Sequence, residues 1–309
     1  MGQTESMRML NNITAVDLRA FKILSLIGKG SFGCVWLVEY MRGNRKVALK
    51  QIAKSFIIEN KIHKEVFNER DILASLFSNH IVNLYATFQD DFFLYIVMDY
   101  CEGKDLRSNL DTETYNEQQI KFMVGCAVLA LEFIHSQNVL HRDIKPENLI
   151  FDSKGYLRIL DFGLSVKLQN EHSKNIDIYQ DYCGTPCYMA PERFIKYKGK
   201  KTYGFESDLY SLGVVLYEIV MGERPFNNEF LDMNLEEVFY LEEDGDNFCD
   251  KDNRYFNVKN TVNLSVKSVS AVNKKLKVSK ELCEFINGLL RFNPLTRLGH
   301  NGYTELKTH

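Results

Sequence analysis

The chain has 309 residues, 45% of them apolar, a formal net charge of −3 and seven cysteines. The length and apolar content suffice for a large core in one or two domains, and the near-neutral charge excludes the strong basic field typical of nucleic-acid-binding proteins. The cysteines are scattered, with neither a CxxC pair nor a zinc-binding spacing, so they predict reduced thiols. We find no apolar run long enough to span a membrane and no secretory signal, and therefore expect a cytoplasmic protein.

Residues 1–20 are polar and lack periodicity, so we expect a flexible N-terminal arm. The first six residues, MGQTES, fit the N-myristoylation pattern and make Gly2 a candidate lipidation site, although a match this short also arises by chance. A single acyl chain without a second signal gives only weak, reversible membrane binding. The start of the chain therefore predicts, at most, reversible peripheral membrane association through a myristoyl group.

Short runs of β-forming residues dominate residues 21–98 and are interrupted by one stretch of helical periodicity. We expect a small, mainly β lobe there, with strands at 21–27, 35–40, 47–52, 82–88 and 92–98 and a helix at 64–76. A linker at 99–104 leads to a larger, mainly helical lobe over 105–309, with helices at 118–136, 211–220 and 279–290. Within it, residues from about 227 to 278 lack a clear period and predict an inserted, mobile surface segment. The predicted fold class is α+β with two lobes.

A glycine-rich turn, GKGSFGCV, lies between the first two expected strands. Glycine lets the backbone approach phosphate oxygens and offer them N–H groups, so the turn is a candidate ATP-binding element. Its residues are Gly28, Lys29, Gly30, Ser31, Phe32, Gly33 and Val35. A plain hairpin turn is the structural alternative, whereas a dinucleotide-binding turn would be followed by a helix and not by a strand.

The third expected strand carries Lys50 in the sequence VALK, where its ammonium group would hold nucleotide phosphates. A lone strand lysine is more often a solvated edge residue, so a carboxylate partner on the following helix is needed. Glu69 and Glu65 are both candidates. We favour Glu69, because it precedes the apolar pair Ile72 and Leu73 that should face the other lobe.

The sequences HRDIKPEN at 141–148, DFG at 161–163 and APE at 190–192 carry the most specific signals. Asp143 is expected to accept or orient the proton of a substrate hydroxyl, and Lys145 to balance charge on a transferring phosphoryl group. Asn148 and Asp161 offer the oxygen ligands that Mg²⁺ prefers. Chance does not explain these sequences in this order together with the glycine-rich turn and the strand lysine.

These motifs resemble the eukaryotic protein kinases over nearly the whole chain, about residues 21–306. The resemblance implies a bilobal fold that binds ATP and Mg²⁺ in a cleft near the linker and transfers the γ-phosphate to protein substrates. It also implies Ser/Thr rather than Tyr specificity, because Lys145 and Thr185 are the residues which that class carries. Further nucleotide contacts are implied at Ala48, Met98, Asp99, Cys101 and Leu149.

Narrower features look like the AGC group of kinases. They are the sequence CGTP at 183–186 and the sequence NPLTRLG at 293–299. The stretches at 82–90 and 103–107 look similar to the YANK branch of that group.

The resemblance also suggests how the enzyme is regulated and what it selects. AGC kinases usually carry a phosphorylated threonine two residues before CGT, where this chain has Asp181. A carboxylate there would attract Arg142, so we expect basal activity without phosphorylation of the loop. The alternative is that Asp181 is an ordinary acidic residue of the solvated surface. Asp105, Glu147 and Glu218 are expected to line the peptide side and to favour basic residues N-terminal to the phosphoacceptor.

Other residues of the same motifs are expected to be structural. The family's internal stack corresponds to Leu73, Leu84, His141 and Phe162, and a buried ion pair is expected between Glu192 and Arg297. The main alternative function is a pseudokinase scaffold with the same fold. That alternative predicts damage to the catalytic set, and this set is intact: Lys50, Asp143, Asn148 and Asp161.

Overall fold

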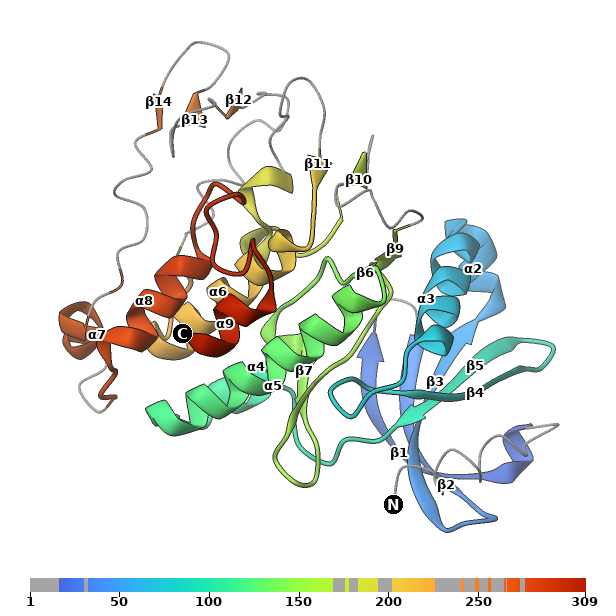
Figure 1. The fold of residues 1–309 in the computed structure, drawn as a ribbon. Coiled ribbons are helices and arrows are strands. Elements are labelled where there is room, and N and C mark those ends of the chain that lie inside the picture. The colour runs from blue at the N-terminus through green and yellow to red at the C-terminus, as the bar shows by residue number, and fades with distance from the viewer. Residues whose placement is uncertain are drawn as a thin grey trace.

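The computed structural model describes residues 17–30, 33–168, 176–177, 183–193, 202–225, 240–241, 248–249, 255–256, 264, 266–272 and 276–309. These residues form two lobes, a small one built on an antiparallel sheet and a larger one built mainly of helices (Figure 1). The predicted α+β bilobal fold is therefore confirmed.

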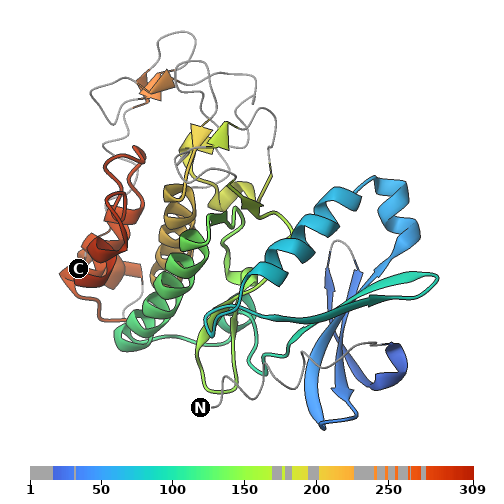
Figure 2. The ribbon, with the colours of Figure 1, turned by 45° about the vertical axis from the view of Figure 1, so that its right-hand side comes forward.

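The small lobe contains a five-stranded antiparallel sheet in the order β1-β2-β3-β5-β4. Its strands are β1 (Phe21–Gly30), β2 (Gly33–Tyr40), β3 (Arg45–Ala53), β4 (Leu84–Gln89) and β5 (Phe93–Asp99). Two helices, α2 (Lys54–Asn60) and α3 (His63–Ser75), accompany this sheet (Figure 2). A short 3-10 helix, η1 (Leu18–Ala20), precedes β1 at the end of the expected N-terminal arm.

Side-chain alternation along β3 lets one strand serve both the core and the site. Val47 and Leu49 are buried in the apolar cluster on one face of the sheet. Ile52 belongs to a separate cluster with Val66 of α3. Because successive side chains of a strand point to opposite faces, Lys50 shares the face of Ile52 and points toward α3.

Helix α2 was not predicted, although the longer helix α3 after it was. Only Ile57 of α2 is buried, so the segment shows no apolar periodicity that would reveal a helix. The helix ends at Lys61, whose φ of 57° is the left-handed conformation common at helix C-termini.

The large lobe is organised around two long helices whose buried faces form its core. Its helices are α4 (Leu106–Leu110), α5 (Glu117–Ser136), α6 (Glu206–Met221), α7 (Val266–Val272), α8 (Lys280–Leu289) and α9 (Tyr303–Thr308). Asn116 and Gln119 form a reciprocal capping box that starts α5. Within the described part of the chain, α5 is the one helix long and apolar enough to cross a membrane, and its packing in the core accounts for that apolarity.

Short hairpins and 3-10 turns connect these helices and carry the expected site residues. β6 (Val139–Leu140) pairs with β9 (Val166–Lys167), β7 (Leu149–Phe151) with β8 (Leu157–Ile159), and β10 (Ile176–Asp177) with β11 (Thr202–Tyr203). The 3-10 turns are η2 (Pro146–Asn148), η3 (Pro186–Tyr188) and η4 (Pro191–Arg193). Backbone bonds from Ile159 to His80 and from Val82 to Ile159 join β8 to the chain that leads into β4.

The segment at about 227–278 is described only in part. Three short strands, β12 (Tyr240–Leu241), β13 (Phe248–Cys249) and β14 (Tyr255–Phe256), form an antiparallel sheet. The unpredicted helix α7 follows, and Leu264 before it exchanges two backbone–side-chain bonds with Asn287 of α8, at 3.0 and 2.9 Å. The end of this segment therefore joins the core of the large lobe.

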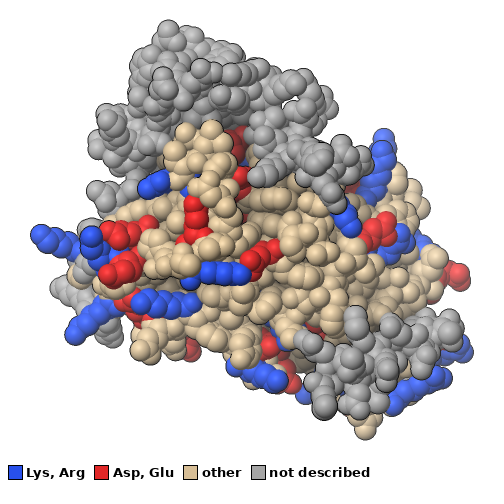
Figure 3. Space-filling view, in the orientation of Figure 1, with Lys and Arg blue, Asp and Glu red and all other residues tan. Residues whose placement is uncertain are grey.

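The visible surface is mixed in charge. On the face shown in Figure 3, lysine and arginine side chains are interspersed with aspartate and glutamate side chains, in keeping with the net charge of −3.

Candidate active site

The hairpin of β1 and β2 carries the expected phosphate-binding turn. Its described residues are Gly28, Lys29 and Gly30 at the end of β1 and Gly33 and Val35 at the start of β2. Ser31 and Phe32 lie outside the described residues. A Cβ atom at Gly33 would lie 2.0 Å from the carbonyl oxygen of Gln51 on β3, so only glycine permits this close approach of the two strands.

Lys50 of β3 and Glu69 of α3 form a buried ion pair, with Nζ and Oε1 2.5 Å apart. The structure thus pairs the lysine with Glu69, whereas Glu65 is exposed on the same helix. Burial alone would lower the pKa of Lys50, but the carboxylates of Glu69 and Asp161 outweigh it and raise that pKa. Lys50 is therefore charged at neutral pH.

Asp143 in the loop after β6 binds three of the other expected residues. Its Oδ2 lies 2.8 Å from Lys145 Nζ and accepts a 3.0 Å bond from Asn148 Nδ2. Its Oδ1 accepts bonds from the Thr185 hydroxyl at 2.8 Å and from the Thr185 backbone N–H at 3.1 Å. Burial opposes ionisation, but Lys145 and the Thr185 hydroxyl lower the pKa of Asp143 overall. Asp143 is therefore an ionised but weak base at neutral pH.

Asp208 of α6 holds this loop in place, and the sequence analysis did not identify it. The side chain is fully buried and accepts the backbone N–H groups of His141 at 2.8 Å and Arg142 at 2.9 Å. It also accepts a 2.9 Å bond from His135 Nε2. Burial opposes ionisation, but His135, His141 and these bonds lower the pKa of Asp208. An acid inside an otherwise buried helix was the available signal, because such a group needs donors.

Tyr303 of α9 extends the contacts of Asp208 to the C-terminal helix. Its hydroxyl lies 2.6 Å from His135 Nδ1. Since a carboxylate only accepts, His135 donates through Nε2, and its Nδ1 is the atom that pairs with the tyrosine hydroxyl. We call His135, Asp208 and Tyr303, with the two backbone N–H groups of the loop, the Asp208 cluster.

Asp161 is the first residue of the DFG sequence and an expected metal ligand. Its backbone is left-handed, with φ of 64°. Its side chain is exposed, whereas the next side chain, Phe162, is fully buried edge-on against the ring of His141. The loop therefore sends the apolar ring into the core and leaves the carboxylate open to a ligand. The Asp161 Oδ1 accepts one 3.2 Å bond from the backbone of Gly163.

The charge and donor set around Asp161 fit a nucleotide-bound Mg²⁺ ion. Two carboxylates, Glu69 and Asp161, act on the single ammonium of Lys50, which leaves an excess of negative charge. The Nδ2 of Asn148 donates to the backbone carbonyl and to the carboxylate of Asp143, so the amide oxygen of Asn148 is the atom available to a cation. In the described residues no three His, Cys, Asp or Glu side chains gather to hold a metal, and Mg²⁺ commonly takes its remaining ligands from water and phosphate. Asn148 and Asp161 would hold the ion, which would neutralise phosphate charge.

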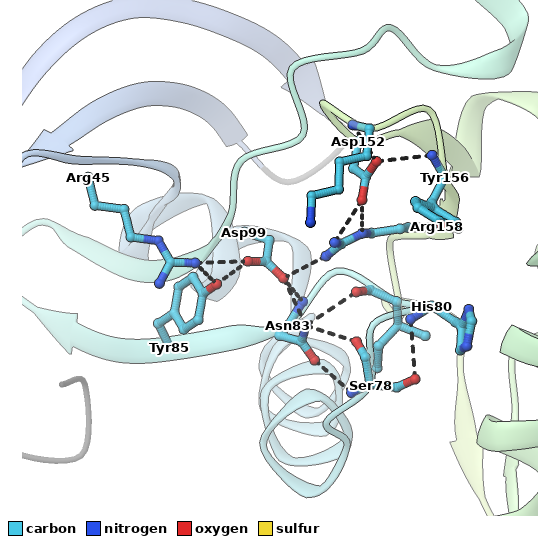
Figure 4. Close-up of polar contacts among 11 residues, drawn as sticks. Arg45, Ser78, His80, Asn83, Tyr85, Asp99, Asp152, Tyr156 and Arg158 are labelled. Carbon is cyan, nitrogen blue, oxygen red and sulfur yellow. Dashed lines mark hydrogen bonds and ion pairs between the residues drawn. The ribbon is translucent and has the colours of Figure 1, made fainter. Parts of the chain in front are cut away.

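Asp99 was expected to contact the nucleotide, but its side chain lies in a polar cluster at the linker (Figure 4). It accepts bonds from the hydroxyl of Tyr85 and from the backbone and Nδ2 of Asn83, the latter two at 3.1 and 2.8 Å. It also pairs with Arg45 at 3.5 Å and Arg158 at 3.3 Å. The backbone N–H of Asp99 also donates to the carbonyl of Asn83, at 3.0 Å. We call these five residues the Asp99 cluster.

The remaining expected nucleotide contacts are apolar or buried. Ala48 and Met98 are cross-strand neighbours on β3 and β5. Leu149 is buried at the start of β7. Burial raises the pKa of the Cys101 thiol to about 12, so this cysteine is not a nucleophile at neutral pH.

Arg142, the expected partner of a charged activation loop, is a buried side chain. Its Nε donates to the carbonyl of Leu164 at 2.5 Å and its Nη1 to the hydroxyl of Tyr203 at 3.2 Å. Asp181 lies outside the described residues. The expected attraction between the two side chains stays a prediction.

The three acids expected to bind substrate all have partners within the chain. Asp105 caps α4 by accepting bonds from the backbone N–H and hydroxyl of Ser108, both at 2.8 Å. Glu147 and Glu218 both bind Arg107, at 3.1 Å each. Sequence reasoning missed Arg107, since a single arginine after a helix cap carries no signal of its own.

Two expected structural contacts are present. His141 and Phe162 pack edge to face with ring centroids 5.1 Å apart. Glu192 binds Arg297 through two bonds of 2.5 and 2.9 Å, and the Arg297 side chain is fully buried.

Comparison with known proteins agrees with this geometry. The protein kinase domain family matches residues 21–309. Human cGMP-dependent protein kinase 2 is 33% identical over 291 residues, which cover 93% of this chain and 34% of that protein. A probable serine/threonine-protein kinase of Dictyostelium discoideum is 35% identical over 312 residues, covering 99% of this chain and 59% of that protein. Rabbit (Oryctolagus cuniculus) Rho-associated protein kinase 1 is 32% identical over 302 residues, which cover 97% of this chain and 20% of that protein.

The chain thus spans about a third of the cGMP-dependent kinases that it matches. The cGMP-dependent and Rho-associated kinases are AGC kinases, so the resemblance to that group is confirmed, while the likeness to the YANK branch stays a prediction. With a family match over nearly its whole length, the chain belongs to the protein kinase domain family.

Proposed function

We propose that the chain is an ATP-dependent protein serine/threonine kinase. The observation that carries this proposal is the arrangement of four side chains from both lobes. Lys50 is charged, and the nearby carboxylate of Asp161 raises its pKa. Asn148 binds Asp143 through its side chain. Its backbone carbonyl accepts a bond from Leu160, the residue before Asp161. Such a set offers a phosphate-binding cation, two oxygen ligands for Mg²⁺ and a carboxylate for the substrate hydroxyl.

The lowered pKa of Asp143 defines its role in the proposed reaction. A weak base does not remove a proton from an alcohol in advance, so Asp143 orients the hydroxyl and accepts its proton as the new P–O bond forms. Lys145, 2.8 Å away, stabilises negative charge that develops on the transferred phosphoryl group. The leaving group is ADP, and the product is a phosphoserine or phosphothreonine.

Transfer of γ-labelled phosphate from ATP with Mg²⁺ tests the proposal. The acceptors are three peptides that differ only in carrying Ser, Thr or Tyr at one position. The wild type should label Ser and Thr peptides, and Asp143→Asn should lower kcat by about 10²–10⁴-fold with little change in Tm. Equal labelling by the two proteins would contradict the proposal. Nucleotide binding without any transfer by the wild type would favour the scaffold alternative.

We also propose that Asp181 replaces a phosphorylated residue of the activation loop, on the grounds of its position before CGT. Protein made without phosphorylation should then be active, and Asp181→Ala should lower kcat. Full activity of that variant would contradict the proposal.

For the first residues we propose myristoylation of Gly2 and a cytoplasmic protein that binds membranes reversibly. The MGQTES start supports this. Intact mass of protein from eukaryotic cells should show one myristoyl group, and Gly2→Ala should remove both the added mass and vesicle binding. An unmodified mass would contradict it.

A further inference from the structure

Arg107 of α4 places its guanidinium group between two acids that were expected to bind substrate. Its Nη2 lies 3.1 Å from each carboxylate oxygen of Glu218, and its Nε lies 3.1 Å from Glu147 Oε1. Nη2 also donates to the hydroxyl of Tyr188 at 2.6 Å, and that hydroxyl donates to Glu218 Oε2 at 2.6 Å. We call these four residues the Arg107 cluster. Its members come from α4, η2, η3 and α6.

Glu218 has little capacity left for another cation. Its side chain is 9% exposed, and both oxygens accept bonds from Arg107. The charge of Glu218 also acts on a second cation, Arg224. Burial lowers the pKa of Arg224, but Glu218, together with Cys187 and Tyr188, raises it. A guanidinium of a bound peptide would therefore meet a carboxylate whose charge is already balanced, and it would be repelled by Arg107.

Glu147 is different, although it shares the same arginine. Its side chain is 45% exposed, and Arg107 binds its Oε1. An exposed carboxylate accepts further donors, because each of its oxygens has two lone pairs. Of the two acids bound to Arg107, Glu147 is therefore the one that keeps the capacity to bind a basic residue of a peptide.

We propose that Arg107 occupies, from within the chain, the position at Glu218 that an arginine of a substrate peptide would otherwise take. Phosphoacceptor peptides with an uncharged residue opposite Glu218 are then used as well as peptides with arginine there. The proposal rests on the proposed kinase activity. It removes Glu218 from the three acids expected to favour basic residues and leaves Asp105 and Glu147.

A peptide series tests this selectivity. Serine peptides carry arginine or alanine at one of the five positions before the phosphoacceptor, and kcat/KM is measured for each pair. The ratio of kcat/KM for the arginine peptide to kcat/KM for the alanine peptide should rise at one position in Arg107→Ala. The rise over the wild type should be about 10- to 100-fold, because a charge-assisted bond to the freed carboxylate of Glu218 has a strength in that range. The double variant Arg107→Ala/Glu218→Gln should return that ratio to the wild-type value. Ratios in Arg107→Ala within twofold of the wild type at all five positions would overturn the proposal.

Two further variants separate this contact from general charge effects. Lys104→Ala removes an exposed positive charge three residues before Arg107 and should leave the ratios unchanged. Arg107→Lys keeps the charge but loses the planar fork, so its ratio should lie between those of the wild type and Arg107→Ala. A rise in Lys104→Ala as large as that in Arg107→Ala would overturn the proposal.

Peptide binding keeps this test separate from the proposed activity. Fluorescence anisotropy gives Kd for labelled arginine and alanine peptides without catalysis, and Tm confirms that each variant is folded. Arg107→Ala should tighten binding of the arginine peptide alone, again by about 10- to 100-fold. An unchanged Kd would overturn the inference, whereas failure of the wild type to phosphorylate any peptide would count against the proposed activity.

Discussion

Two aspartates, Asp208 and Asp99, hold the catalytic loop and the linker by different means. Asp208 lies under the catalytic loop, is 1% exposed, and accepts its bonds from the loop backbone and a buried histidine. Asp99 lies at the linker and has more partners, but two of these are the arginines Arg45 and Arg158, whose side chains are 43% and 19% exposed. Donors exposed to water lose little when an acceptor is removed, whereas buried donors have no alternative. The comparison indicates that burial, more than the number of partners, determines what each aspartate contributes.

Replacement of Asp208 should have the largest effect. Asp208→Asn removes the charge that buried donors share, so the free energy of unfolding should fall by about 3–5 kcal/mol. Urea unfolding measures this change. Asp91→Asn, an exposed aspartate in the small lobe, is the matched control and should change stability by less than about 0.5 kcal/mol. A loss below about 1 kcal/mol in Asp208→Asn would contradict the importance given to burial.

Acid should remove the contribution of Asp208. Its pKa is below the ordinary 3.8, so the unfolded chain takes up this proton more readily than the native state. The stabilisation is therefore complete above about pH 4 and is lost as the pH falls through the lower native value. Unfolding measured from pH 7 to pH 2 should give a constant difference between wild type and Asp208→Asn down to about pH 4 and a shrinking difference below it. A difference that already shrinks between pH 7 and 5 would contradict the direction of this shift.

Replacement of Asp99 should cost less. Asp99→Asn keeps an oxygen for Asn83 or Tyr85 and weakens the pairs with Arg45 and Arg158, so we expect a loss of about 1–2 kcal/mol. High salt should reduce this loss, since one arginine is well exposed. Urea unfolding at two salt concentrations measures both. A loss as large as that of Asp208→Asn would show that partner number outweighs burial.

The smallest effect should come from the edge of the Asp208 cluster. Tyr303→Phe removes one hydrogen bond to His135 but none to Asp208 itself, so we expect a loss of about 0.5–1.5 kcal/mol. Urea unfolding again gives the value. A loss near 3 kcal/mol would mean that the histidine needs α9 to hold Asp208.

The helix of Asp208 shows how sequence reasoning succeeded and where it stopped. The apolar run predicted a helix from residue 211, but α6 begins five residues earlier at Glu206. The first turn carries polar residues that interrupt the apolar pattern, and Asp208 is one of them. Short helices escaped for a related reason: α2, α4, α7 and α9 span seven residues or fewer, too few to establish a period.

The sequence by itself determined the two lobes and the chemistry-bearing residues of the short motifs, because alternation, helical period and motif spacing are local properties of a chain. Tertiary structure decided which partners those residues have. It confirmed Glu69, which the sequence favoured, as the partner of Lys50. It alone bound the Asp99 side chain to Asn83 and Arg107 to Glu218. Such pairs join residues far apart in the chain, and their strength depends on burial, which exists only once the core has formed.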